Sequence, residues 1–218
     1  IKEVWFLQNI SEIERGFYET LKKVFDVSLG IIFAAVTIVI SPIVAVGIKI
    51  FDPGPIFYRQ IRVGKNGKIF TLIKFRSLPV INPKSDFGAS LKSDFEMKKP
   101  DKEEITPFGR FLRKSHWDEL PQVWNILKGD MSFIGPRPEK PEFVKQLSAE
   151  IPFYEMRQLI KPGIAGWAQL HNPNAGPSLK ETLEKLQYDL YYIKNRSVFL
   201  DLSIILKTIR ILLSGDGK

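Results

Sequence analysis

The chain has 218 residues, of which 44% are hydrophobic and 26% charged, and it carries a formal net charge of +8. This length accommodates one domain with a core, or one domain plus a membrane element. The excess of positive charge favours an anionic partner: nucleic acid, an anionic lipid headgroup or a phosphorylated substrate. The absence of cysteine excludes disulfides and a cysteine nucleophile, and two histidines argue against a histidine-rich metal site.

The N-terminal segment, residues 1–23, has an amphipathic helical pattern. Apolar residues such as Phe6, Ile13 and Phe17 recur among charged ones. We expect a helix that lies in a membrane interface with its apolar side toward the acyl chains.

A charge-free apolar run of 22 residues follows, from Val27 to Ile48, within a predicted membrane element at residues 24–50. It has the length of a membrane span, but Ser41 and Pro42 interrupt it, and proline in a helix costs about 3 kcal/mol. Lysines or arginines flank the run on both sides, which suits a hairpin that returns to the cytoplasmic face. We favour a re-entrant helix-break-helix; the alternatives are a kinked span and a buried helix of a soluble protein.

The remainder, residues 51–218, is predicted to form a cytoplasmic catalytic domain. Residues 56–58 and 69–75 are rich in β-branched and aromatic residues and flank Gly64-Lys-Asn-Gly67, which predicts a small β-hairpin. Residues 79–104 combine prolines, glycine and charges, and predict a mobile loop.

Four helical segments are predicted beyond the loop. One begins at Thr106-Pro107, and a helical segment containing Asp118 and Glu119 ends at Gly129. Ser178-Leu-Lys-Glu181 is a capping box that opens a helix to about Lys194, and a last apolar helix covers residues 197–213 and is expected to lie in the membrane interface. The predicted fold class is therefore α+β, mainly α, with a membrane-associated catalytic domain.

Asp118 and Glu119 are the strongest candidates for chemistry. They stand at the predicted start of a helix, where the macrodipole favours negative charge by about 0.3–1 kcal/mol. Arg110, Arg113 and Lys114 precede them and add positive charge. Both effects favour ionised carboxylates, which suit a nucleophile or a metal ligand better than a proton donor. On these two residues alone, the simpler interpretation is that they are acidic residues of the kind common at helix starts, without a catalytic role.

Six short sequence motifs in order change that interpretation. They are Lys74-Phe-Arg-Ser77, Thr106-Pro-Phe-Gly-Arg-Phe-Leu-Arg113, Asp118-Glu-Leu-Pro-Gln122, Leu127-Lys-Gly-Asp-Met-Ser132, Gly135-Pro-Arg-Pro138 and Lys161-Pro-Gly-Ile-Ala-Gly-Trp-Ala-Gln169. Together they resemble the bacterial polyprenyl-phosphate sugar-1-phosphate transferases, the monotopic phosphoglycosyl transferases, over nearly the whole chain. The interruption at Ser41-Pro42 is similar to the re-entrant membrane helix of that family.

The resemblance implies transfer of a sugar-1-phosphate from a nucleotide-activated sugar, with UDP favoured, to a membrane polyprenyl (undecaprenyl) phosphate. By similarity, Asp118 forms a covalent phosphosugar intermediate and Glu119 helps to hold Mg²⁺. Lys74, Arg76, Arg110, Arg113 and Arg137 are the candidate substrate-binding cations, because arginine in particular suits bidentate phosphate contacts. Asp201 also resembles an acid of the family, although helix capping explains it equally well.

The resemblance further implies a location at the cytoplasmic face of the bacterial inner membrane, with membrane lipid as a partner and no nucleic acid. The chain departs from the family pattern at Leu78-Pro-Val-Ile81 and at Glu104, which puts loop closure and sugar preference in question. No pattern specifies the sugar or the oligomeric state. The competing readings are a basic, membrane-attached binding module and a catalytically idle scaffold, but neither explains an acid pair within a basic tract.

Overall fold

The computed structural model describes residues 16–79, 105–172 and 178–214. Most of the interfacial helix predicted for residues 1–23, and almost all of the loop predicted for residues 79–104, lie outside these ranges, as do Val80-Ile81 and Glu104.

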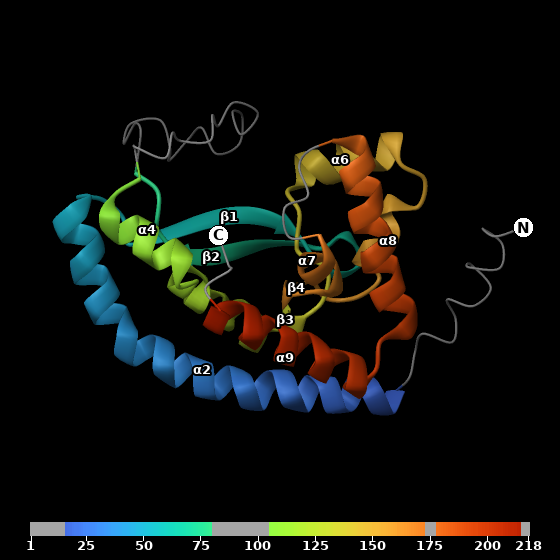
Figure 1. Ribbon diagram of the computed structural model, residues 1–218, viewed down its shortest axis with the longest axis horizontal. Coiled ribbons are helices and arrows are strands. Elements are labelled where there is room, and N and C mark those ends of the chain that lie inside the picture. The colour runs from blue at the N-terminus through green and yellow to red at the C-terminus, as the bar shows by residue number, and fades with distance from the viewer. Residues whose placement is uncertain (1–15, 80–104, 173–177, 215–218) are drawn as a thin grey trace, which may run out of the picture.

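One long helix, α2 (Gly16–Phe51), covers the apolar run. It crosses the boundary predicted between residues 23 and 24 without interruption, and it also continues through Pro42. The predicted break is therefore a bend: Figure 1 shows α2 running along the bottom of the molecule and then turning upward. The Ser41 hydroxyl donates to the Thr37 carbonyl at 2.6 Å, next to the Ile38 carbonyl that Pro42 deprives of its usual amide donor. One missing hydrogen bond bends a helix without ending it when the residues on both sides are helical.

Helix α2 packs on the rest of the protein through a narrow stripe that includes Gly30, Ala34, Val44 and Ile48. A Cβ on Gly30 would lie 2.8 Å from the Leu127 side chain, so glycine permits the close approach. The outward side is apolar and exposed; its large residues include Ile31, Ile32, Ile38, Val39, Ile43, Val46 and Ile50. Among the described residues, α2 is the helix long and apolar enough to cross a membrane, judged by length and composition alone.

The predicted hairpin is confirmed. Strands β1 (Phe57–Val63) and β2 (Ile69–Phe75) pair antiparallel, with Phe57 opposite Phe75 and Val63 opposite Ile69. Asn66 and Gly67 in the connecting turn η2 (Lys65–Gly67) have positive φ values of 55° and 74°, which explains the Asn-Gly pair.

The helix predicted at Thr106-Pro107 is α4 (Pro107–Lys114), whose first turn is capped by Thr106. The helix predicted around Asp118 is different in kind: residues Trp117–Gln122 form a 3₁₀ helix, η4, and α5 begins only at Val123 and ends at Lys128. Pro121 has no N–H for an α-helical bond and restricts the preceding residue, which accounts for the tighter start. Gly129 ends α5 in the left-handed conformation, as predicted.

Several short elements were not predicted. Strands β3 (Ser132–Ile134) and β4 (Gly163–Ala165) pair in parallel as a second, two-stranded sheet. Between them lie α6 (Pro141–Glu150) and the 3₁₀ helix η5 (Tyr154–Gln158), and α7 (Trp167–His171) follows. Strands of three residues carry too short a pattern to be recognised from sequence.

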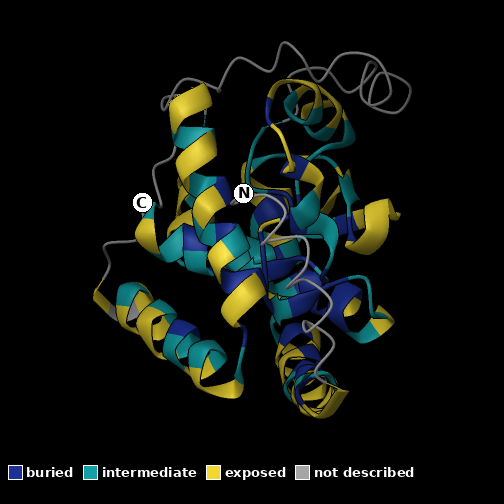
Figure 2. Cartoon of the chain, turned by 90° about the vertical axis from the view of Figure 1, so that its right-hand side faces the viewer, coloured by how far each residue is buried: buried dark blue, intermediate teal, exposed yellow. Residues whose placement is uncertain are grey.

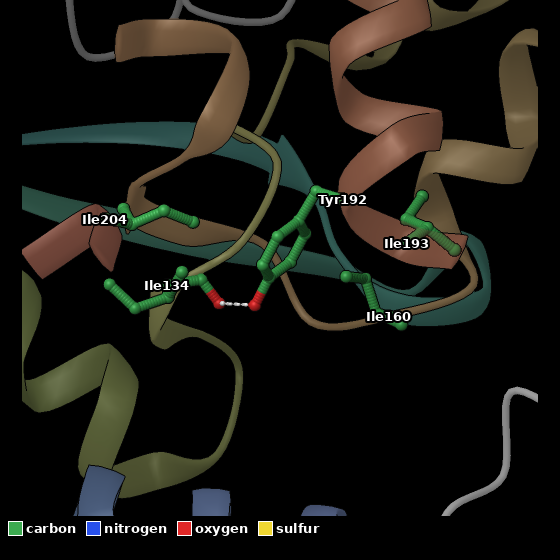
Figure 3. Packing of buried hydrophobic residues seen from close by; sticks show 5 residues of the cluster. All are labelled: Ile134, Ile160, Tyr192, Ile193 and Ile204. Atoms are coloured by element: carbon green, nitrogen blue, oxygen red, sulfur yellow. Dashed lines mark hydrogen bonds between the residues drawn. The ribbon is translucent and has the colours of Figure 1, made fainter. Parts of the chain in front are cut away.

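The last two helices agree with the prediction: α8 (Leu179–Asn195), with Ser178 as its N-cap, and α9 (Val198–Ser214). A core cluster joins α8 and α9 to β3. Figure 3 shows the Tyr192 ring of α8 among Ile134, Ile160 and Ile204. Helices α2 and α9 both lie along the lower side of the molecule in Figure 1, and exposed residues, in yellow, lie on this lower side in Figure 2. Both helices carry exposed large hydrophobic residues.

Asp201 does not cap α9. Its carboxylate accepts hydrogen bonds from Tyr18 at 2.8 Å, from Lys22 at 2.7 Å and from Tyr192 at 2.7 Å. Asp201 thus ties α9 to the first turns of α2 and to the end of α8, and so fixes the two apolar helices relative to each other.

Candidate active site

The acid pair of η4 lies against the end of strand β2. Lys74 Nζ is 2.5 Å from Glu119 Oε1, and Arg137 Nη2 is 3.0 Å from the same oxygen. Lys74, Glu119 and Arg137 are 18 to 63 positions apart in the sequence, and the fold brings their side chains together. The Glu119 side chain is 14% exposed, whereas that of Arg137 is 43% exposed and so can still contact a ligand from solvent.

Asn125 fixes η4 and α5 against the hairpin. Its buried side chain donates to the Thr71 carbonyl at 2.7 Å and accepts from the Ile73 amide at 3.2 Å, which completes the open edge of β2. His116, with a positive φ of 56°, turns the chain from α4 into η4. The two features hold Glu119 beside Lys74, which follows Ile73 directly.

Arg137 is positioned by the second sheet. The Gly135 amide donates to the Ala165 carbonyl and the Gly163 amide to the Pro136 carbonyl, both at 2.9 Å. A Cβ on Gly135 would lie 2.5 Å from the Lys161 carbonyl oxygen, so this close approach requires glycine. The segment after β3 is thereby held against the segment before β4, with the Arg137 side chain directed to Glu119.

The two carboxylates have opposite electrostatic environments. Burial disfavours the charged form of Glu119, but Arg137 and Lys74 outweigh it and lower the pKa of Glu119 to about 2. Burial, and then the negative charge of Glu119, raises the pKa of Asp118, against the opposing effects of cations that include Lys74 and Arg113. The expectation that the surrounding cations favour the ionised form of both acids agrees with the lowered pKa of Glu119, whereas for Asp118 the effect of burial outweighs that of the cations.

The remaining predicted cations are placed differently. Arg76 is buried and pairs with Asp52, through Nη1 and the carboxylate at 2.7 Å and through Nη2 and the backbone carbonyl of the same residue. The structure therefore directs Arg76 to the end of α2 rather than to Glu119. Arg110 and Arg113 are exposed on α4, and of the two Arg113 acts electrostatically on Asp118.

The sequence analysis missed a charged cluster behind Arg137. It contains Arg157 of η5 and Asp189 of α8, which are paired at 2.8 Å, together with Glu139, Lys185 and Arg62. Arg137, Glu139 and Arg157 also line a pocket with Gly64 and Gln158. Single charges in separate helices give no local signal of such a cluster.

The acid pair has the donor chemistry for a magnesium ion, because carboxylate oxygens are the hard ligands that Mg²⁺ prefers. Among the described residues, no group of three or more His, Cys, Asp and Glu side chains is arranged to hold a metal. Mg²⁺ needs only one or two carboxylates when substrate phosphates supply further oxygens. Both cations contact Oε1 of Glu119, so the second oxygen of this ionised carboxylate and the neighbouring Asp118 are the oxygen donors of this site.

Comparison with known proteins identifies the family. The model of the family described as "Bacterial sugar transferase" matches residues 17–215. The chain is 42% identical over 200 residues to the UDP-N-acetylgalactosamine-undecaprenyl-phosphate N-acetylgalactosaminephosphotransferase of Aeromonas hydrophila, which covers 92% of the chain and 45% of the relative. It is also 42% identical over 166 residues to the UDP-glucose:undecaprenyl-phosphate glucose-1-phosphate transferase of Xanthomonas campestris pv. campestris, covering 76% of the chain and 33% of the relative. The chain belongs to the bacterial sugar transferase family.

A shorter relative matches almost end to end. The "Uncharacterized sugar transferase EpsL" of Bacillus subtilis (strain 168) is 36% identical over 201 residues, which covers 90% of the chain and 89% of the relative. By contrast, the chain spans less than half the length of the Aeromonas and Xanthomonas relatives.

Proposed function

We propose that this protein transfers a sugar-1-phosphate from a UDP-sugar to undecaprenyl phosphate, the first step in assembly of a surface glycan. The observation that carries the proposal is the contact of Lys74 and Arg137 with one oxygen of Glu119, beside Asp118. The names of the Aeromonas and Xanthomonas relatives support the substrate class: UDP-sugars and undecaprenyl phosphate.

In the proposed first step, a carboxylate oxygen of Asp118 attacks the phosphorus that carries the sugar. A bond forms between this oxygen and phosphorus, and the bond from phosphorus to the bridging oxygen of UDP breaks. UMP leaves with the bridging oxygen and its electron pair. The nucleophile must be ionised, so the raised pKa of Asp118 makes this step sensitive to acid.

In the proposed second step, an oxygen of undecaprenyl phosphate attacks the same phosphorus. The bond between Asp118 and phosphorus breaks and the carboxylate is regenerated. The product is an undecaprenyl diphosphate sugar. The two steps together need no oxidant, reductant or further reactant.

The surrounding charges suit this chemistry because three anionic groups must meet. Lys74 and Arg137 offset the repulsion between the acid pair and the incoming phosphates, and Arg113 adds a weaker positive field. Glu119, kept ionised by these cations, would hold Mg²⁺ together with substrate oxygens. When bound, Mg²⁺ would neutralise charge on the diphosphate.

The lipid substrate requires a membrane surface, and we assign this role to the exposed apolar sides of α2 and α9. Their outward residues include Ile31, Ile38 and Ile43 on α2, and Phe199, Leu202 and Leu206 on α9. We propose that α2 enters and leaves the bilayer on one side, with its bend at Ser41-Pro42 inside it, at the cytoplasmic face of the inner membrane.

A panel of sugar nucleotides tests the function. Purified protein in liposomes that contain undecaprenyl phosphate and Mg²⁺ is incubated with UDP-N-acetylgalactosamine, UDP-glucose or UDP-galactose, and release of UMP is followed. We expect release with at least one sugar, dependent on the lipid for multiple turnovers. Omission of the lipid should leave a phosphosugar on Asp118 that mass spectrometry of peptides detects. Turnover without this adduct in rapid-quench samples would contradict the covalent route. If none of the three UDP-sugars released UMP, the proposed substrate class would be contradicted.

A further inference from the structure

The segment that carries Arg137 is held by four consecutive backbone carbonyls. The Pro136 carbonyl accepts from the Gly163 amide at 2.9 Å, and the Glu139 carbonyl accepts from the Val63 amide at 2.9 Å. Between them, the Pro138 carbonyl accepts from Arg62 Nη1 at 3.0 Å, and the Arg137 carbonyl accepts from Arg157 Nη2 at 3.0 Å. The bond to Arg137 itself therefore comes from a charged side chain in η5.

Arg157 is itself rigidly held. It is 5% exposed, and both Nε and Nη2 donate to Asp189 Oδ2, at 3.2 and 2.8 Å, while Nη1 donates to the Tyr154 hydroxyl at 2.8 Å. Asp189 is 1% exposed on α8. The planar guanidinium thus reaches three partners in different directions, which a lysine ammonium on a flexible chain cannot reproduce.

Side-chain direction at Arg137 depends on its backbone. Pro136 and Pro138 restrict the conformation of the chain around it, but they do not fix where the segment lies relative to η4. The bonds to the neighbouring carbonyls contribute to that placement, and the bond from Arg157 adds the contact at Arg137 itself. A continuous series of contacts then runs from Asp189 through Arg157 and Arg137 to Glu119.

We propose that Arg157 is a positioning residue for the sugar-phosphate transfer, and that it acts by holding the backbone of Arg137 so that the guanidinium faces Glu119 and the substrate phosphates. This inference rests on the proposed function. Arg157 does not itself contact the acid pair, and its pairing with Asp189 serves to orient it.

A double-mutant cycle tests the inference, with UMP release from the active UDP-sugar of the panel as the readout. Arg157→Lys in the wild-type background is expected to lower kcat by about 10- to 100-fold, because small misplacements of a phosphate-binding group have effects of this size. In the Arg137→Ala background the same substitution should change kcat by less than about 2-fold, since groups that act through one another are not additive.

Arg196→Lys is the matched control. Arg196 is also buried and pairs with Glu19 of α2, so Arg196→Lys makes the same change of guanidinium to ammonium at another buried arginine of the fold. Its effect on kcat, whatever its size, should be the same factor in both backgrounds. Thermal unfolding in detergent reports whether each variant is folded.

An equal loss from Arg157→Lys in both backgrounds would overturn the inference, because Arg157 would then act independently of Arg137. A large loss from Arg137→Ala in the same data would leave the proposed function intact. If Arg137→Ala retained full activity, both the inference and the assigned role of Arg137 would be overturned. Should Arg157→Lys fail to fold, Asp189→Asn takes its place in the cycle, with the same expected lack of effect in the Arg137→Ala background and the same opposing outcome.

Discussion

The hydroxyl of Ser132 in strand β3 donates a hydrogen bond of 3.0 Å to the carboxylate of Asp26 in α2. The same carboxylate oxygen accepts from the Phe133 amide at 3.1 Å, and the Phe133 ring packs against Phe25 and Phe33 of the helix. Strand β3 leads directly to Arg137. The long apolar helix and the segment that carries Arg137 are therefore joined through a buried carboxylate and the adjoining ring contacts.

Asp26→Ala should destabilise the protein, because the substitution leaves the Ser132 hydroxyl and the Phe133 amide without their acceptor. Hydrogen bonds to a charged group contribute about 1.5–3 kcal/mol each, so we expect a clear fall in Tm in detergent. Asp26→Asn retains one acceptor oxygen and should lose less. Equal Tm values for the alanine variant and the wild type would show that the contact does not contribute to stability.

Asp118→Asn should abolish UMP release, by a factor of about 1,000 or more, because an amide is not a nucleophile toward phosphorus and the covalent step is lost. The variant should bind liposomes as the wild type does, since Asp118 lies far in sequence from the apolar residues of α2 and α9 and is not part of their exposed faces. Co-sedimentation with liposomes supplies this control. Normal turnover by the variant would rule out the aspartyl intermediate.

The pH dependence of activity should report the ionisation of Asp118. Since the pKa of this carboxyl is raised, kcat/KM should begin to fall at a higher pH than for an ordinary aspartate as the solution is acidified. Arg113 opposes the rise, so Arg113→Gln should move this acid limb to still higher pH, and only modestly because the side chain is exposed and screened. Lys114→Gln makes the same charge change on the same helix and should shift the limb less. A shift of the limb to lower pH in Arg113→Gln would contradict the assignment.

Glu119 should stabilise the folded protein at neutral pH and lose this effect as the pH falls. Its pKa is lowered from 4.5 to about 2, so its stabilising effect is present above pH 4.5 and is lost as pH falls toward 2. A shift of this size corresponds to about 3 kcal/mol at neutral pH. The stability difference between wild type and Glu119→Gln should therefore shrink between pH 5 and pH 3. A difference that stayed constant over this range would mean that Glu119 does not gain its stability as an anion.

The topology of α2 can be tested with single cysteines, because the chain contains no native cysteine. Phe17→Cys and Phe51→Cys place thiols at exposed positions near the two ends of the helix. In sealed vesicles, a re-entrant helix exposes both thiols to a membrane-impermeant reagent on the same side. Labelling on opposite sides would show a span. Ile38→Cys, at an exposed apolar position, should be protected in either case, and its reaction with the aqueous reagent would contradict membrane insertion.

Local patterns were sufficient for the elements whose signals are short-range. The Asn-Gly turn predicted the hairpin, Ser178 and Glu181 predicted the start of α8, and the charge-free run predicted a long apolar helix. The local signal of proline was misleading where the residues around it favour a helix. Pro42 bends α2 without ending it, and Pro121 replaces the start of an α-helix with a 3₁₀ turn.

The sequence by itself determined the ordered motifs, and with them Asp118, Glu119 and most of the cations of the site. Only the tertiary structure decided how those cations are used: Lys74 and Arg137 contact Glu119, Arg76 is turned to Asp52, and Arg157 of η5, paired with Asp189 of α8, supports Arg137. The reason is physical. A charge in a sequence has no partner until the fold brings a second charge to it, and that pairing, together with burial, sets opposite pKa shifts for two adjacent acids.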